Sequence, residues 1–179
     1  KMKRCLPKEV NKAADIIIKH LTDFGLSVKV YEPDIYLSIP LSASVTADED
    51  TFKAKPPSMS LSVPEGVRGE LVYLKANKKN LRKYTQNSSE VFVDGNINFK
   101  EKLHNKILLT EGFGNPALTS LVQEYGAKGL VVINPGQDIH WGTCTSIWGT
   151  PGLNDLEKKP KIPVIAVNKQ SGKQLINIA

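Results

Sequence analysis

The sequence contains little of what would indicate a metal centre, a disulfide framework or a membrane span. Its 179 residues include two cysteines and three histidines, and neither a C-x-x-C nor an H-E-x-x-H pattern occurs. Cys5 and Cys144 lie far apart in the chain, so their presence does not indicate a redox compartment. No apolar run approaches the roughly 20 residues that cross a bilayer. The sequence therefore predicts no zinc knuckle and no membrane span, and it leaves the cellular location open.

Acidic residues are fewer than basic ones, which gives a formal net charge of +6. The lysines are spread over the chain, with short clusters at 78–79, 82–83 and 158–161. Aromatic residues do not alternate with these clusters, as a platform for stacked bases would require. We therefore expect no nucleic-acid partner.

An activated nucleophile and a full set of metal ligands are also missing. No G-x-S-x-G pattern occurs, and Cys144 is interpreted as a small apolar core residue rather than a nucleophile. Asp138 and His140 could share one side of a strand, but a zinc site needs at least three converging ligands. We therefore expect this chain to contain no catalytic residue, no metal ligand and no cofactor.

The most regular pattern lies between Asn105 and Gly136 and predicts a strand, a helix and a second strand. Lys106–Thr110 and Leu130–Ile133 are apolar runs typical of strands buried on both faces. Asn115 is a good N-cap, the following proline suits the first helical position, and Gly126 is predicted to end the helix. A unit of this kind predicts parallel strands and an α/β fold.

Elsewhere the periodicity predicts shorter elements. A helix is expected over Glu9–Phe24, where apolar residues recur at helical spacing. A loop is expected over Asp48–Val67, which is rich in turn residues. The remaining expected elements are strands at 27–31, 35–39, 43–47, 69–74, 90–94 and 162–167, a short helix at 77–84, and a helix that starts at Ser171.

One short motif suggests a different class of function. Gly112, Gly114 and Ala117 match the G-x-G-x-x-A pattern that binds dinucleotides between a strand and a helix. The next strand ends at Asn134, however, where an acidic residue would be needed to contact the ribose. A nucleotide-binding domain that uses Gly112 and Gly114 stays an alternative.

Four motifs carry a resemblance to a known family. In chain order they are Asn105-Lys106-Ile107, Tyr125-Gly126-Ala127, Ile162-Pro163-Val164 and Gly172-Lys173-Gln174-Leu175. In this order they resemble a protease-associated (PA) domain. The resemblance implies a swivelling β/β/α fold, here with an N-terminal helix-strand extension, and no catalytic residues.

A second set of motifs resembles zinc-dependent aminopeptidases, glutamate carboxypeptidase and transferrin receptor. These motifs are Phe24-Gly25-Leu26, Tyr36-Leu37-Ser38-Ile39-Pro40, Gly69-Glu70-Leu71-Val72-Tyr73 and Ile147-Trp148-Gly149-Thr150-Pro151. The resemblance implies that residues 1–45 belong to a peptidase domain and that 46–179 form an inserted PA domain. It also implies zinc in the parent peptidase domain, since the family's ligands begin with an H-x-D motif that this chain lacks. The expected partners are that peptidase domain and a peptide substrate.

The candidate binding residues come from the same resemblance and from aromatic content. In glutamate carboxypeptidase the insert supplies an arginine shortly after the "L-V-Y" strand, and Asn77 or Lys78 stands there. A neutral Asn77 would lack the bidentate cationic fork that holds an acidic side chain. His140, Trp141 and Trp148 are residue types that interfaces favour, although they serve equally well in a core. The expected function is a non-catalytic module that shapes substrate access or binds peptide, with a free-standing protein-binding PA module as the alternative.

Overall fold

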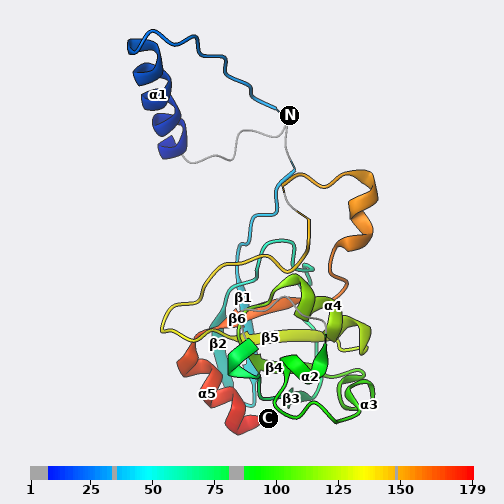
Figure 1. Ribbon diagram of the computed structural model, residues 1–179. Coiled ribbons are helices and arrows are strands. Elements are labelled where there is room, and N and C mark those ends of the chain that lie inside the picture. The colour runs from blue at the N-terminus through cyan, green and yellow to red at the C-terminus, as the bar shows by residue number, and fades with distance from the viewer. Residues whose placement is uncertain (1–7, 34–35, 81–86, 148) are drawn as a thin grey trace. The chain divides into compact units, whose positions relative to one another are not determined.

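The computed structural model describes residues 8–33, 36–80, 87–147 and 149–179 (Figure 1). Contacts divide the chain into two compact units, Lys1–Ile35 and Tyr36–Ala179. The boundary predicted after Val45 separates a segment of a peptidase domain from a PA domain. The division into compact units does not test that assignment, so it stays a prediction. Of the described residues, none lies in a helix long and apolar enough to cross a membrane.

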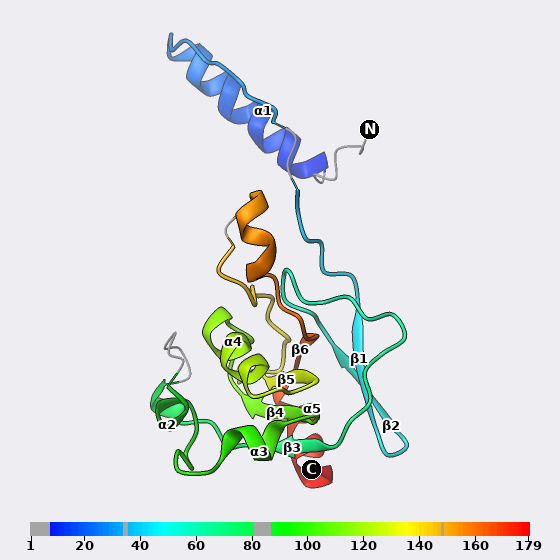
Figure 2. The same ribbon diagram turned by 90° about the vertical axis from the view of Figure 1, so that its right-hand side faces the viewer.

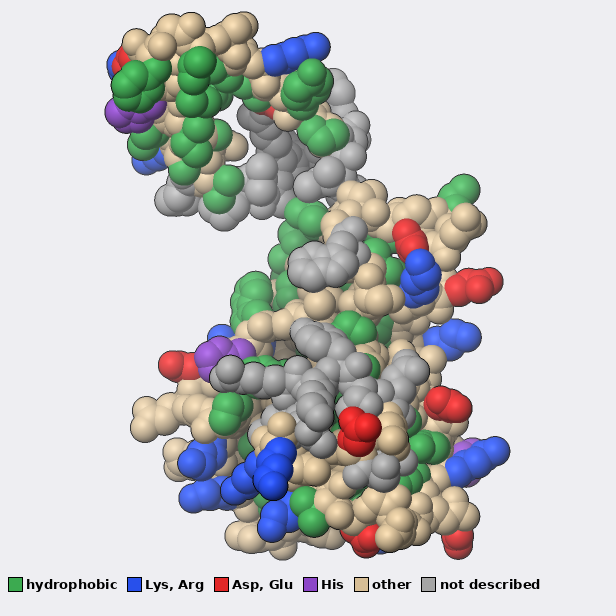
Figure 3. All heavy atoms as spheres, in the orientation of Figure 1, with side chains coloured by type: hydrophobic (Ala, Val, Ile, Leu, Met, Phe, Trp, Pro, Cys, Tyr) green, Lys and Arg blue, Asp and Glu red, His purple; other side chains and the backbone are tan. Residues whose placement is uncertain are grey.

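The first unit contains the predicted amphipathic helix, α1, over Lys8–Asp23. Gly25 follows it with a φ of +76°, a conformation that suits a residue without a Cβ. The strand predicted at 27–31 is wrong, because these residues form no regular structure. In the described part of this unit no second strand supplies the backbone partners that a strand needs. Figure 3 shows hydrophobic side chains on the surface of α1.

The second unit is built on a parallel sheet with the strand order β3-β4-β5-β6. The strands are β3 (Leu71–Tyr73), β4 (Ile107–Glu111), β5 (Gly129–Ile133) and β6 (Val164–Val167). All three strand pairs are parallel, with Leu108 opposite Leu130 and Val131 opposite Ile165. The predicted α/β class and the predicted parallel pairing are therefore confirmed.

Helices cover one face of this sheet, and a hairpin with one helix covers the other (Figure 2). The first core cluster contains Phe99, Leu121 and Val122 from the helical face. The second contains Phe52, Ile133 and Leu175 from the hairpin, the sheet and the last helix. The helical face holds α2 (Ser88–Val91), α3 (Phe99–Leu103) and α4 (Pro116–Glu124), and the other holds β1 (Ala43–Ala47), β2 (Asp50–Ala54) and α5 (Lys169–Ile178).

The two long helices of this unit begin as their sequences require. The Asn115 side chain accepts a hydrogen bond from Leu118 N at 2.9 Å, and Pro116 occupies the first helical position of α4. Gly126 ends α4 with a φ of +75°. Asn168 caps α5 in the same way as Asn115 caps α4, accepting from Ser171 N at 2.8 Å. Because this cap starts the helix at Lys169, the start predicted at Ser171 is two residues late.

Several shorter predictions need correction. The loop predicted over Asp48–Val67 contains β2, which pairs with β1 in antiparallel register. The strand predicted at 90–94 is instead the end of α2, where Asn87 O accepts from Glu90 N and Val91 N, followed by one bridge from Phe92 to Ala76. Of the helix predicted at 77–84, the described part contains a 3₁₀ turn, η1 (Lys78–Asn80), and residues 81–84 lie outside the described ranges. No strand forms at 36–39, whereas β1 confirms the strand at 43–47.

Candidate functional site

Asn77 and Lys78 follow β3, at the start of the 3₁₀ turn η1. Asn77 N donates to Val91 O at 2.8 Å, and the Asn77 side chain accepts from Lys79 N at 3.2 Å. The Asn77 amide oxygen therefore stabilises the turn, whereas Lys78 is exposed. Next to them, Glu111 accepts from Tyr73 Oη at 2.7 Å and from Ala76 N at 2.8 Å. Burial and, after it, the hydrogen bond to Glu111 raise the pKa of Tyr73, so the phenol stays protonated and ties two strand ends together.

His140 and Trp141 lie together after β5, on a loop that Asn134 fixes. The buried Asn134 side chain donates to Gly112 O at 2.9 Å and accepts from His140 N at 2.8 Å. The His140 ring meets the Phe113 ring edge-on, with centroids 6.0 Å apart. The described residues show no contact that joins this loop to Asn77 or Lys78. Trp148 lies outside the described residues.

Lys55 belongs to this aromatic group although the sequence did not indicate it. Its ammonium lies 5.8 Å from the centroid of the Trp141 ring and donates to Ile139 O at 3.1 Å. The Trp141 side chain is 62% exposed. Lys55 follows β2 and bridges to Ala166 in β6, so only the tertiary structure brings it next to Trp141. The result is a surface on which the partly buried Lys55 lies beside the exposed side chains of His140 and Trp141.

The backbone and packing geometry at Gly112 and Gly114 does not fit the dinucleotide-binding alternative. Gly112 has a φ of +121°, which a tight turn requires of glycine. A Cβ on Gly114 would stand 2.7 Å from Val164 Cγ1, so the protein's own side chains fill the space beside this glycine. Asn134, at the position of the ribose-binding acidic residue, is 1% exposed and bonded on both sides. The motif serves close packing of α4 against the sheet.

The histidines, cysteines and carboxylates of the described residues do not fit a zinc site, since no three of them gather in one place. Cys144 is 2% exposed, and its thiol donates to Ser58 O at 3.2 Å. Burial raises the pKa of the Cys144 thiol to about 12. The thiol is therefore protonated at neutral pH and is a poor nucleophile. Its place among buried hydrophobic side chains confirms the interpretation as a core residue.

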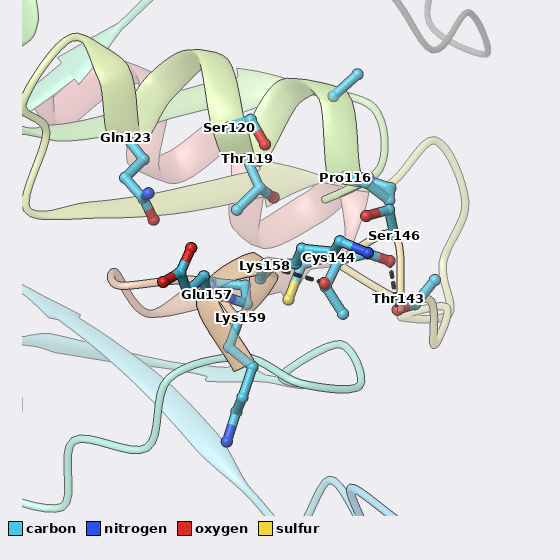
Figure 4. A pocket seen from close by; sticks show the side chains of 13 residues that line it. Pro116, Thr119, Ser120, Gln123, Thr143, Cys144, Ser146, Glu157, Lys158 and Lys159 are labelled. Carbon is cyan, nitrogen blue, oxygen red and sulfur yellow. Dashed lines mark hydrogen bonds between the residues drawn. The ribbon is translucent and has the colours of Figure 1, made fainter. Parts of the chain in front are cut away.

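A groove of about 890 Å³ runs beside α4, and we call it the α4 groove (Figure 4). One wall is a face of α4, and the other consists of residues 143–146 and the end of η2 (Leu153–Lys158) with the residues that follow it. Its lining residues are Pro116, Ala117, Thr119, Ser120, Gln123, Thr143, Cys144, Thr145, Ser146, Glu157, Lys158, Lys159 and Pro160. None of them is predicted as a binding residue from the sequence, since a long loop without periodicity gives no indication of the helix it faces.

Hydrogen bonds hold the loop wall in place. Gln123 Oε1 accepts from Lys161 N at 2.7 Å, and the buried Thr145 hydroxyl donates to Lys158 O at 2.8 Å. The Lys158 ammonium lies 2.6 Å from Asp155, and the hydrogen bond from Lys158 lowers the pKa of that carboxyl. The Lys159 ammonium lies over the Tyr36 ring, 5.7 Å from its centroid. Both lysines of the wall are therefore engaged outside the groove.

The fold resembles those of solved zinc aminopeptidases. In a structure of BSAP, a zinc aminopeptidase from Bacillus subtilis, the match has a TM-score of 0.53 and 14% identity and covers 93% of this chain. In the aminopeptidase from Aneurinibacillus sp. strain AM-1, it has a TM-score of 0.52 and 17% identity and covers 96% of this chain. The chain spans 35% of the length of each of these proteins. No family model and no curated protein sequence matches the chain.

Proposed function

We propose that this chain is the front part of a zinc aminopeptidase-type protein and that its second unit is a non-catalytic PA domain. The observation that supports the proposal is the extent of the structural match, which covers nearly all of this chain but only 35% of each aminopeptidase. At 14–17% identity such a match speaks for a shared fold, and the order of the sequence motifs supplies the link to function. In this proposal the rest of the parent protein supplies the zinc ligands and the catalytic groups.

In this proposal residues 1–45 belong to the peptidase domain. The exposed apolar side chains of the first unit support this part, since Ile17 is 60% and Phe24 is 79% exposed. Apolar side chains at helical spacing are typical of a face that packs against another element. The remaining peptidase domain of the parent chain is the partner proposed for that face.

The proposed role of the PA domain is to shape access of a peptide to the catalytic centre. Trp141, His140 and Lys55 offer a surface for this role, because an exposed tryptophan is common at interface hot spots and Lys55 places a cation over its ring. A free-standing binding module would use the same surface. The reading frame after Ala179 distinguishes the two, since only the peptidase proposal requires an H-x-D motif there.

An activity comparison tests the proposal. The 179-residue chain and the protein encoded by the full reading frame would each be assayed with zinc and leucine p-nitroanilide. We expect release of p-nitroaniline by the full protein, loss of that activity when EDTA removes the metal, and none by the 179-residue chain. Saturable hydrolysis by the 179-residue chain alone would contradict the non-catalytic assignment, and an inactive full protein without an H-x-D motif would contradict the peptidase assignment.

A further inference from the structure

The α4 groove has the length of a short extended peptide. Its helical wall is formed by Pro116, Thr119, Ser120 and Gln123, which lie at positions i, i+3, i+4 and i+7 and therefore on one face of α4. Seven helical steps of 1.5 Å span about 10 Å. An extended strand rises about 3.3 Å per residue, so about three residues of peptide match this length. The volume of about 890 Å³ lies within the range of ligand sites.

The two ends of the groove also differ in electrostatic potential. Figure 4 shows Glu157 facing Gln123 across the groove, at the carboxyl-terminal end of α4. The helix dipole adds partial negative charge at this end and partial positive charge at the Pro116 end. Lys158 pairs with Asp155, and Figure 4 shows the Lys159 side chain pointing away from α4. The Glu157 end therefore favours a cationic group and disfavours a phosphate or nucleotide.

A buried hydroxyl in the helical wall has unused hydrogen-bonding capacity. Thr119 is 2% exposed, and its Oγ1 has no hydrogen-bond partner among the described residues. Figure 4 shows its side chain directed from α4 into the space above Cys144. Burying a hydroxyl without a partner is unfavourable, and a ligand carbonyl that reached it would remove that cost. This observation is independent of the helix dipole and of Glu157.

From these three features we propose that the α4 groove binds an extended peptide of about three residues. The peptide places a cationic group between Gln123 and Glu157, and its carbonyl oxygens accept from Thr119 and Ser120. The groove lies wholly within the unit Tyr36–Ala179, so this inference goes beyond the proposed function and does not depend on the peptidase assignment. The cation is either the N-terminal ammonium of a peptide or a lysine or arginine side chain.

Three tripeptides separate these sources of charge. Ala-Ala-Ala-amide presents only an N-terminal ammonium, acetyl-Lys-Ala-Ala-amide presents only a side-chain ammonium, and acetyl-Ala-Ala-Ala-amide is neutral. Each would be titrated into the ¹⁵N-labelled 179-residue chain, and affinity would be read from amide chemical shifts. We expect shifts at Ser120, Gln123 and Ser146, and one cationic peptide binding about two- to fivefold more tightly than the neutral one, the range for an exposed ion pair.

Two carboxylate variants locate the cation. Glu157→Gln removes the charge that faces the groove, and Glu124→Gln removes an exposed carboxylate of α4 that does not line it. We expect Glu157→Gln to abolish the preference for the cationic peptide and Glu124→Gln to leave it unchanged. Equal effects of the two variants, or no shifts in the groove at about 10 mM peptide, where even a millimolar complex is populated, would overturn the proposal.

A third variant distinguishes a role of the Thr119 hydroxyl in binding from a role in folding. Thr119→Val keeps the shape of the side chain and removes the unpartnered oxygen. We expect the free chain to melt at the same or a higher temperature while affinity for all three peptides falls about fivefold, the loss of one hydrogen bond. An unchanged affinity in a folded Thr119→Val chain would overturn the role of Thr119 in binding. Because these measurements use the chain without a catalytic domain, their outcome is separate from the activity comparison.

Discussion

At the residue scale, two buried threonines show that hydrogen bonding decides whether a buried hydroxyl stabilises or destabilises the fold. Thr110 lies in β4, is fully buried, and its Oγ1 has no hydrogen-bond partner among the described residues. Thr145 is 3% exposed, but its hydroxyl donates to Lys158 O at 2.8 Å and accepts from Ile147 N at 3.4 Å. The same side chain therefore costs free energy at one site and contributes it at the other.

Replacing each threonine by valine should change stability in opposite directions. Thr110→Val removes an unsatisfied oxygen and adds a side chain that strands favour, so we expect the free energy of unfolding to rise by about 1 kcal/mol. Thr145→Val should lower it by about 1–2 kcal/mol, because the carbonyl of Lys158 loses its donor. Urea denaturation of both variants checks this. A loss of stability in Thr110→Val would show that its hydroxyl is bonded in solution.

At the scale of elements, one glycine fixes how α5 packs on the sheet. Gly172 lies within α5, and a Cβ at this position would overlap the side chain of Ile133 in β5. Leu175, one turn further along, is fully buried in the second core cluster. The G-x-x-L motif that contributed to the family resemblance is therefore a packing motif, which places the helix backbone directly against β5.

An alanine at Gly172 tests that contact. Alanine favours a helix over glycine by about 1 kcal/mol, but here we expect Gly172→Ala to lower the free energy of unfolding by about 1–3 kcal/mol, because Ile133 would have to move. Combining it with Ile133→Ala in a double-mutant cycle should show a favourable coupling. Gly142→Ala, at a glycine with open space around it, serves as the control and should be neutral. A more stable Gly172→Ala chain would contradict the close packing.

At the scale of the whole molecule, the two units differ in how they bury their apolar residues. The unit Tyr36–Ala179 holds both core clusters, one on each face of the sheet. The apolar residues of α1, by contrast, are largely exposed. Basic side chains gather near α5 on the face shown in Figure 3, and acidic ones lie elsewhere on it. Because the second unit holds both core clusters, most of the free energy of unfolding should come from that unit.

A chain that starts at Tyr36 tests this division. We expect its thermal midpoint to stay within about 2 °C of that of the 179-residue chain, because none of the described residues in the removed segment belongs to either core cluster. Leu103→Ala, which truncates a fully buried residue of α3, should instead lower the midpoint by about 5 °C or more. A comparable loss on removing residues 1–35 would show that these residues help to stabilise the core.

Local chemistry determined much of the fold directly from the sequence. The caps at Asn115 and Gly126 act between residues close in the chain, and the apolar runs of β4 and β5 required burial on both faces. These features alone predict the parallel α/β unit. The predictions that were wrong concern short segments: the strands at 27–31 and 36–39 that do not form, β2 inside a predicted loop, and α2 where a strand was predicted. Over so few residues, periodicity does not separate a helix from a strand, and pairing with a distant partner decides.

The sequence by itself presented no zinc-binding pattern, indicated Cys144 as a core residue, and indicated His140 and Trp141 as neighbouring candidates for binding. Only the tertiary structure placed Lys55 beside Trp141, closed the space around Gly114 with Val164, and set Glu157 across from Gln123 to form a groove. The physical reason is the separation in sequence over which each kind of interaction acts. Capping and periodicity act within a few residues, whereas a binding surface is made by side chains that are distant in sequence and meet only when the sheet and its covering layers have packed.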